Sequence, residues 1–477
     1  MPVLPKVTSI CRLSGSSLSH SPRFLYYSGA IRTGKADFSP LRVSVCRMIF
    51  QLAAALFVFG YAVCSTAGSA TAQEILIHNA PIPILSEYYT DPAARKRVIP
   101  PLPKFTTEVP TMGQLQTALN RQLQLRQSDR TLVETVTPFV IMQTSFAYGA
   151  GTQFLCRVSG GESMAQSRTQ PVAQPKTEPA YAIGILCWSI PARNKILLTD
   201  SVGGLYAKVG YGYQRVGGEF LALLASVGVT EDYEIRPGGH GKKRRTIADL
   251  IESEKNQTVL YGPQAWRMAA LAFYLPDIHQ TWIASDGNEV SLLKLAQYEL
   301  DRPVLWDRSE SVDRLYGLAR ARERFVAEIA SGDSDPELAA LVEKIDAFFH
   351  LLRPWIHSLS DPDSGLWMGR YLSEAPKEPR PVQVLLSSAS ILRWLILSAE
   401  SNEELSELRG ERMRRTIWNL ALLLVNTLPP QTEYSALSDD QVAAWGTTLQ
   451  VFRLYLEKTG LYQGQQEKDT ADNRSYR

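Results

Sequence analysis

The sequence contains few of the residues that bind metals or carry out redox chemistry. Its 477 residues include 5 cysteines and 6 histidines. No two cysteines form a Cys-x-x-Cys pair, and no two histidines form the His-x-x-x-His or His-Glu-x-x-His pattern of zinc proteins. A Walker A loop and a Gly-x-Ser-x-Gly nucleophile elbow are also absent. We therefore expect no metal and no other cofactor.

The chain also lacks a strong charge of either sign. Its formal net charge is +2, but residues 1–72 hold seven Lys or Arg and a single Asp, so without them the charge is −4. Nucleic-acid binding relies on a basic surface that neutralises phosphates. The composition, 45% hydrophobic and 21% charged, is that of an ordinary globular protein. We expect no nucleic-acid partner.

The N-terminal region has the three parts of a secretory signal. Arg42 and Arg47 precede an apolar run over 48–63, and small residues follow as far as the Ala-Thr-Ala sequence at 70–72. The run is about 16 residues long, shorter than the roughly 20 that a membrane-spanning helix needs. We expect residues 48–72 to be a cleaved signal peptide, which leaves no stable transmembrane span, and residues 1–47 to be an N-terminal extension or a mis-assigned start. The protein is then exported to the periplasm, the cell envelope or the extracellular space.

Only Cys156 and Cys187 remain after such a cleavage. An even number of cysteines in an oxidising compartment suits one disulfide. Two buried free thiols that pack as small apolar side chains are the alternative. The sequence leaves both interpretations open.

The region after the signal divides into three parts. Residues 73–180 contain a proline-rich leader, a helix predicted from Met112 to about Arg126, and a polar linker. Residues 181–460 form the main domain, which opens with a β-hairpin predicted over 195–209, its turn near Gly203 and Gly204. Residues 461–477 form a polar tail that we expect to be disordered.

Helical apolar stripes dominate the chain after Gly217. Leu271, Leu293 and Leu315 follow one another at intervals of about 22 residues, which corresponds to one helix and one loop per interval. The stripes cover 220–227, 265–275, 290–300, 312–325, 338–352, 384–399, 413–428 and 442–456. They predict an all-α domain of repeated helical hairpins.

Several of these segments resemble a family of uncharacterised exported bacterial proteins with an α/α toroid like that of squalene cyclases and prenyltransferases. The similar stretches are 181–188, 207–214, 313–319, 391–395 and 445–455, and the sequence Asp-Pro-Asp-Ser-Gly-Leu-Trp at 361–367 resembles the end of a Gln–Trp repeat. The resemblance implies an α/α toroid over 181–460, in a degenerate member of the family. It implies no specific activity.

The chain departs from that family where its histidines would lie. Inner helices of the family often begin with Thr-His or Gly-His, whereas Asp313, Ser390 and Thr447 occupy the corresponding places here. The Asp-x-Asp-Asp acid of terpene cyclases is also absent. Both remaining cysteines precede the later helices, which supply the zinc ligands of protein prenyltransferases. These departures argue against the chemistry of those enzymes.

The resemblance also predicts a mouth, where the N-termini of parallel inner helices face one end of a central cavity. The candidate mouth residues are Glu219, Arg267, Glu289, Asp313, Arg314, Ser390, Trp394 and Thr447. Simple helix capping and cavity lining explain such residues. Alternatively, the mixture of charged and aromatic groups binds a sugar or peptide.

We interpret the protein as an exported, non-catalytic binding or scaffolding module whose partner is an unidentified protein or glycan. One alternative is a carbohydrate-active hydrolase or lyase that uses two of the carboxylates of Glu219, Glu289 and Asp313. A terpenoid-cyclase-like enzyme is the other alternative. The assignment as an enzyme stays open, with the non-catalytic interpretation favoured.

The first prediction concerns the start of the mature chain. Cleavage after the Ala-Thr-Ala sequence would leave Gln73 as the first residue. N-terminal sequencing of the natural protein should therefore begin at Gln73. An intact N-terminus upstream of Met48 on a cytoplasmic protein would contradict export.

Overall fold

The computed structural model describes residues 101–127, 132–158, 176–201, 204–237, 244–332, 335–428 and 436–461. Over these residues the chain is mainly helical, with small strand hairpins, which confirms the expected fold class at this level. The expected signal peptide and nearly all of the C-terminal tail lie outside the described residues. None of the described helices has both the length and the apolar character needed to cross a membrane.

Most helices coincide with the predicted apolar stripes. The described α-helices are α3 (Met112–Gln127), α4 (Pro138–Tyr148), α5 (Ala182–Cys187), α6 (Glu219–Ser226), α7 (Ile247–Asn256), α8 (Ala265–Tyr274), α9 (Leu292–Asp301), α10 (Ser309–Ser331), α11 (Pro336–Ser358), α12 (Pro381–Leu397), α13 (Asn402–Arg409), α14 (Glu411–Thr427) and α15 (Asp439–Lys458). A short 3₁₀ turn, η3 (Val133–Thr135), precedes α4. The stripe over 290–300 begins too early, because Ser291 caps α9 by accepting a hydrogen bond from the Lys294 backbone N–H.

The strands form four separate antiparallel hairpins. They are β1 (Gln153–Val158) with β2 (Lys176–Tyr181), β3 (Leu198–Ser201) with β4 (Gly204–Ala207), β5 (Glu234–Ile235) with β6 (Arg245–Thr246), and β7 (Thr281–Ile283) with β8 (Glu289–Ser291). The β3–β4 hairpin, in which Ser201 pairs with Gly204, confirms the hairpin predicted over 195–209. The others were not expected from the sequence, and the strands β5 to β8 have only two or three residues each.

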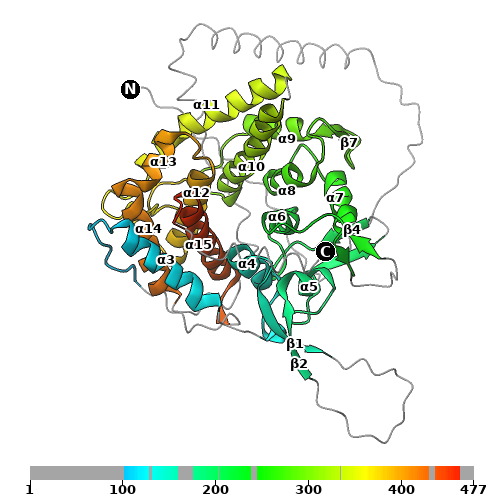
Figure 1. Ribbon diagram of the computed structural model, residues 1–477, viewed down its shortest axis with the longest axis horizontal. Helices are drawn as coiled ribbons and strands as arrows, with labels where there is room; N and C mark the ends of the chain where they lie inside the picture. The colour runs from blue at the N-terminus through cyan, green and yellow to red at the C-terminus, as the bar shows by residue number, and fades with distance from the viewer. Residues whose placement is uncertain are drawn as a thin grey trace, which may run out of the picture. The chain divides into compact units, whose positions relative to one another are not determined.

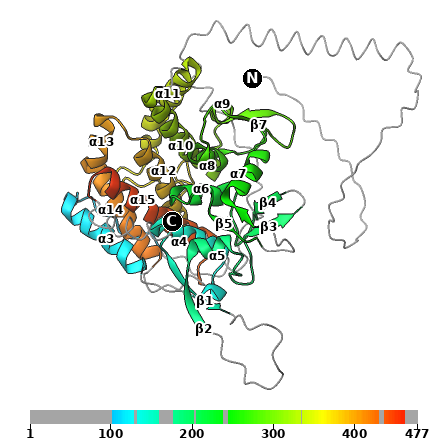
Figure 2. The same cartoon turned by 45° about the vertical axis from the view of Figure 1, so that its right-hand side comes forward.

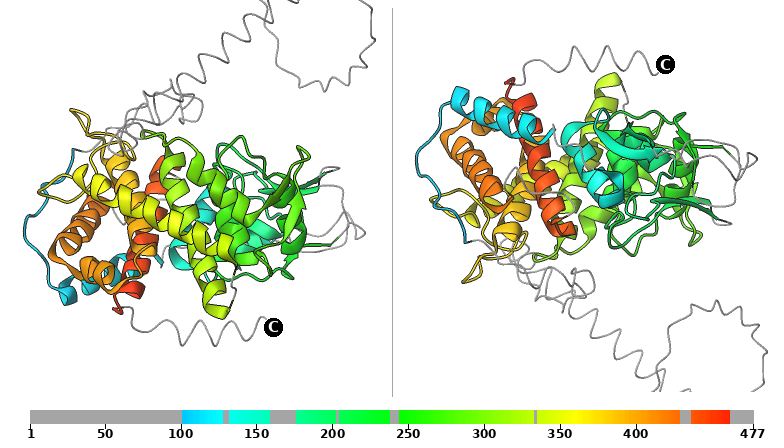
Figure 3. Two further views of the ribbon diagram at one scale, coloured as in Figure 1. Left: turned by 90° about the horizontal axis from the view of Figure 1, so that it is seen from above. Right: turned by 90° about the horizontal axis from the view of Figure 1, so that it is seen from below.

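Six helices contact one another in a cyclic order. Helix α4 packs on α6, α6 on α8, α8 on α10, α10 on α12 and α12 on α15, and α15 in turn packs on α4. Figure 1 shows these helices around a common centre, with α3, α9, α11, α13 and α14 outside them, and Figure 2 shows the same order from another direction. The views from above and below in Figure 3 show the red α15 beside the cyan α3. We call these six the central helices.

Helices α3 and α4 belong to this packed unit, although the sequence placed them in the leader and linker region. Helix α3 packs on α14 and α15, and α4 packs on α5, α6 and α15. Every residue of α4 from Pro138 to Ala147 is buried. A helix buried on all sides has no polar face, so it gives no amphipathic signal in the sequence. The domain boundary predicted at residue 181 therefore leaves out two packed helices.

The two cysteines are buried free thiols, the second of the two alternatives left open by the sequence. Both Cys156 and Cys187 are free and buried. Burial raises the pKa of the Cys187 thiol well above its usual range. The thiols pack as apolar side chains, and the structure contains no disulfide between them.

Glycines allow some of the central helices to approach closely. A Cβ atom at Gly317 of α10 would lie 2.5 Å from the carbonyl oxygen of Ala265, the first residue of α8. One at Gly446 of α15 would lie 2.8 Å from the Cβ of Gln143 in α4. Real Cβ atoms do not come so near to other atoms, so each of these close approaches requires a glycine.

The second prediction tests the contact between α10 and α8. Because the obstructing atom at Gly317 belongs to the backbone, Gly317→Ala should lower the free energy of unfolding by about 1–3 kcal/mol. Gly113→Ala in α3 is the matched control, since nothing lies within 4 Å of its added Cβ. Urea unfolding of the two variants measures the difference. Equal unfolding midpoints for the two variants would show that the helices do not approach as described.

Candidate functional site

A group of polar and aromatic side chains lies among the six central helices, and each of these helices contributes to it. Its members are Gln143 (α4), Glu219 (α6), Trp266 (α8), Asp313 and Tyr316 (α10), Arg393 (α12) and Gln450 (α15), joined by Arg215 from the loop before α6 and by Tyr371 from the loop before α12. All of them except Arg215 are buried. We call this group the central cluster.

Arg393 connects most of the cluster. Its guanidinium carbon lies 4.2 Å from the centre of the Tyr316 ring and 5.1 Å from that of Trp266. Its Nη1 donates a hydrogen bond of 3.3 Å to Oε1 of Gln450, and its Nη2 lies 3.7 Å from Oδ1 of Asp313. Burial lowers the pKa of this guanidinium. The cation is therefore held mainly by two aromatic faces and one carboxylate.

Glu219 begins helix α6, and both of its carboxylate oxygens are engaged. Oε2 accepts a hydrogen bond of 2.7 Å from the backbone N–H of Arg215. Oε1 accepts hydrogen bonds from Nη2 and Nε of the same arginine, at 2.9 and 3.1 Å, and from Nε2 of Gln143 at 3.3 Å. The Glu219 side chain is 0% exposed, whereas that of Arg215 is 30% exposed. Arg215 is thus the side of the cluster that solvent reaches.

Asp313 is the cluster's proton-binding group near neutral pH. Burial raises its pKa to about 6, although Arg215 and Arg393 oppose the rise. The nearby carboxylate of Glu219 adds to it. This buried carboxyl, 3.7 Å from Arg393, is therefore protonated in a substantial fraction of molecules at mildly acidic pH.

Tyr371 reaches the cluster from a strained backbone position. Its φ angle is +54°, a left-handed conformation that a bulky residue rarely adopts. The conformation is fixed by a 2.7 Å hydrogen bond from its backbone N–H to Oγ of Ser387 in α12. Burial raises the pKa of its hydroxyl, while Arg215 acts in the opposite direction. Backbone strain of this kind is characteristic of functional positions.

The structure brings together two of the eight candidate residues, Glu219 and Asp313. Ser390 and Thr447 are buried in α12 and α15, one turn before Arg393 and Gln450. The sequence placed Ser390, Trp394 and Thr447 near helix starts, and this placement is wrong. Helix α12 begins at residue 381 and α15 at residue 439, so these three residues lie well inside their helices.

The remaining candidates face other elements. Nε of Arg267 donates a 2.7 Å hydrogen bond to Glu254 of α7. Arg314 donates to the backbone carbonyls of Leu300 and Arg302. Glu289 is exposed on β8, where it pairs with Lys294 at 3.3 Å. Trp394 packs edge-on against Phe349 of α11.

Sequence reasoning missed Arg393, Tyr316, Trp266 and Tyr371. The first three lie on helices that it identified, but helical periodicity does not separate residues that face the centre from residues that pack between neighbouring helices. Tyr371 lies in a loop, and nothing in the sequence signals a left-handed tyrosine. Tyr316, Trp266 and Tyr371 are all aromatic, and this shared residue type was the clue that the sequence offered.

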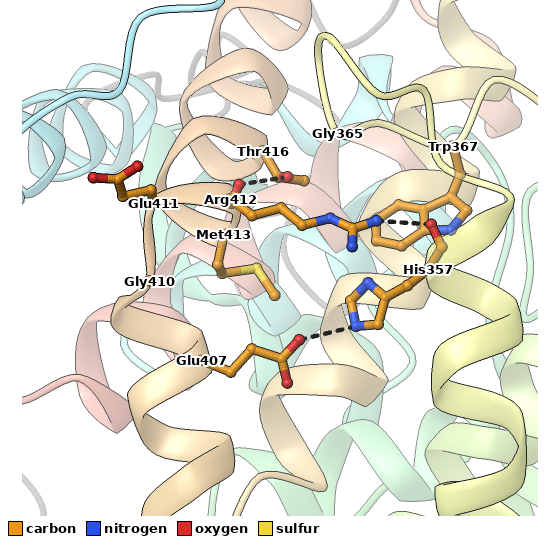
Figure 4. A pocket seen from close by; sticks show the side chains of 9 residues that line it. All are labelled: His357, Gly365, Trp367, Glu407, Gly410, Glu411, Arg412, Met413 and Thr416. Carbon is orange, nitrogen blue, oxygen red and sulfur yellow. Dashed lines mark hydrogen bonds and ion pairs between the residues drawn. The ribbon is translucent and has the colours of Figure 1, made fainter.

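A pocket lies beside the stretch 361–367, which resembles the end of a Gln–Trp repeat in sequence. Figure 4 shows this pocket, of about 150 Å³, with His357, Trp367, Glu407 and Arg412 among its lining residues. His357 Nε2 lies 3.2 Å from Oε1 of Glu407 and lowers the pKa of that carboxyl. Arg412 donates to the carbonyl of His357 at 2.7 Å.

The stretch itself has a structural role. Asp361 Oδ2 accepts hydrogen bonds of 2.7 Å from the backbone N–H and the hydroxyl of Ser364, which forms a turn. Gly365 has a φ angle of +75°, and a Cβ there would lie 2.1 Å from Oγ1 of Thr416. The buried Trp367 donates from Nε1 to the carbonyl of Ile356 at 2.7 Å.

In the described part of the chain, no group of three or more His, Cys, Asp or Glu side chains is arranged to hold a metal ion.

The third prediction follows from the position of Asp313. The folded protein keeps its proton up to about pH 6, whereas an aspartate of the unfolded chain loses it near pH 4. Between these values unfolding releases a proton, so stability falls as the pH rises. Relative to Asp313→Asn, the wild-type free energy of unfolding should therefore decrease by up to about 3 kcal/mol from pH 4 to pH 7. Urea unfolding across this range measures it, and parallel pH profiles would contradict the assignment.

Comparisons of the chain with known proteins do not identify this site. No family model, no curated protein and no solved structure matches the chain. The cyclic packing of the central helices and the geometry of the central cluster are therefore the observations from which a function is proposed.

Proposed function

We propose that the protein is an exported, non-catalytic binding or scaffolding module built on an α/α toroid. The cyclic contacts of the six central helices support the toroid, because consecutive inner helices of such a fold pack side by side until the last meets the first. Helices α5, α7, α9 and α11 each follow a central helix in the chain and pack against at least one, as outer helices would. Helix α14 precedes α15 and packs on α12 and α15. The sequence resemblance to exported toroid proteins supports the same architecture.

The observation that carries the non-catalytic interpretation is the engagement of the charged groups of the central cluster with one another. The guanidinium of Arg393 lies over the rings of Tyr316 and Trp266. Both oxygens of Glu219 accept hydrogen bonds from Arg215. A carboxylate held in this way is not available as a nucleophile or as a general base.

The two enzymatic alternatives fit the cluster less well. A glycoside hydrolase needs two accessible carboxyl groups on opposite sides of a scissile bond. Asp313 has the raised pKa of a general acid, but Glu219 is engaged and Glu289 lies outside the cluster. An isoprenoid cyclase needs a dry, apolar cavity, whereas charged side chains from α6, α10 and α12 meet here.

The proposal includes a compartment and a partner class. The signal-like pattern over 48–72 supports export to the periplasm, the cell envelope or the extracellular space. The partner is a protein or glycan that contacts the side of the cluster at which Arg215 reaches solvent. A weakly acidic chain does not favour nucleic acid.

The fourth prediction separates binding from catalysis. The purified mature chain, incubated with a panel of polysaccharides and oligosaccharides, should release no product, because the central cluster offers no pair of carboxylates that is free to act. Chromatography of the products measures turnover, and thermal shifts of the protein measure binding. Glu219→Gln and Asp313→Asn are tested beside the wild type. Product formation that either substitution abolishes in a folded protein would establish an enzyme instead.

A further inference from the structure

The buried guanidinium of Arg393 has fewer partners than its position demands. Among the described residues, its Nε has no hydrogen-bond partner. Its one hydrogen bond, to Gln450, is long at 3.3 Å, and its contact with Asp313, at 3.7 Å, is beyond hydrogen-bond distance. An arginine side chain that is 4% exposed and offers five N–H donors normally has most of them satisfied. The unused donors point to a missing acceptor.

We propose that the central cluster binds a small carboxylate ligand, which enters beside Arg215 and accepts hydrogen bonds from the unused donors of Arg393 when Asp313 is protonated. This inference rests on the binding function proposed above and names the class of ligand. Planar guanidinium groups match a carboxylate in shape and in donor geometry. The 30% exposure of Arg215 gives the ligand its route of entry.

The charges of the cluster favour a single negative charge. Arg215 and Arg393 carry two positive charges, and Glu219 neutralises one of them. With Asp313 ionised the cluster is balanced, and with Asp313 protonated it has an excess of one positive charge. A monoanionic carboxylate restores the balance, whereas a phosphate dianion would leave an excess negative charge in a buried place.

The groups around Asp313 make this proton exchange specific. Four residues shift the pKa of its carboxyl. They are Arg215, which precedes α6, Glu219 of α6, Trp266 of α8 and Arg393 of α12. The charge of Asp313 also raises the pKa of Tyr371. Arg370 lowers that pKa and Asp440 raises it, because their charges are opposite. Arg320, beside Tyr316, is paired with Glu323 at 2.8 Å. Asp313 is therefore the group that exchanges its proton when an anion arrives.

The test measures the binding of D-glucuronate to the full mature protein by calorimetry. If only the form with Asp313 protonated binds, the affinity should fall about tenfold for each pH unit above pH 6, or roughly 50-fold between pH 6 and pH 8. Titrations in two buffers of different ionisation enthalpy should show the uptake of about one proton per ligand at the upper end of this range. D-Glucose and inorganic phosphate are the comparison ligands.

Two variants make the test specific. Asp313→Asn should bind glucuronate with no dependence on pH over this range and with no proton uptake. Glu299→Gln is the matched control, since Glu299 is another buried carboxylate whose pKa burial raises, paired with Arg302 outside the cluster. It should keep the pH dependence of the wild type.

Three outcomes overturn the inference. Glucose binding as tightly as glucuronate, or phosphate binding in place of glucuronate, would exclude the carboxylate class while leaving a binding module in place. A pH dependence that Asp313→Asn retains would exclude the proton exchange. By contrast, turnover of a glycan would overturn the proposed function itself.

Discussion

One positive charge in the middle of six helices constrains the rest of the domain. Arg393 is buried away from water, so the surrounding helices must supply the polar contacts that water would otherwise make. Helices α8 and α10 supply aromatic faces, α10 a carboxylate and α15 an amide oxygen. Because these groups come from separate helices, their positions are correct only when the helices are assembled in one arrangement. Buried polar groups can specify a unique structure in this way.

The same constraint extends to the loops that enter the centre. The loop before α6 places Arg215 against Glu219, and Gly218, with a φ angle of +84°, allows α6 to begin directly beside α8. The loop before α12 is fastened to that helix at two successive serines. Ser388 accepts from the backbone of Trp367, and Ser387 from that of Tyr371. Loops anchored to the helices that carry the cluster hold its remaining side chains in place.

The sequence predicted most of the helices and much less of the site. Apolar stripes located α8, α10 and α12, because apolar residues recur in these segments at helical spacing. Helix α4, which is buried all round, lies in the stretch that the sequence assigned to the leader and linker region. Glu219 and Asp313 were found because they lie near the expected starts of inner helices. Arg393 was passed over in favour of its neighbour Trp394, because one residue along a helix changes the direction of the side chain by about 100°.

The contact that closes the cycle, between α15 and α4, joins segments that are distant in the chain. Helix α4 ends at residue 148 and α15 begins at residue 439, and Gly446 makes their approach possible. During synthesis, α4 is complete long before the helix that covers it exists. Its largely apolar surface is exposed, or covered by something else, until the last helix of the domain forms. The domain therefore acquires its stability late and in one step, and a chain truncated before α15 would lose the partner of a helix near its beginning.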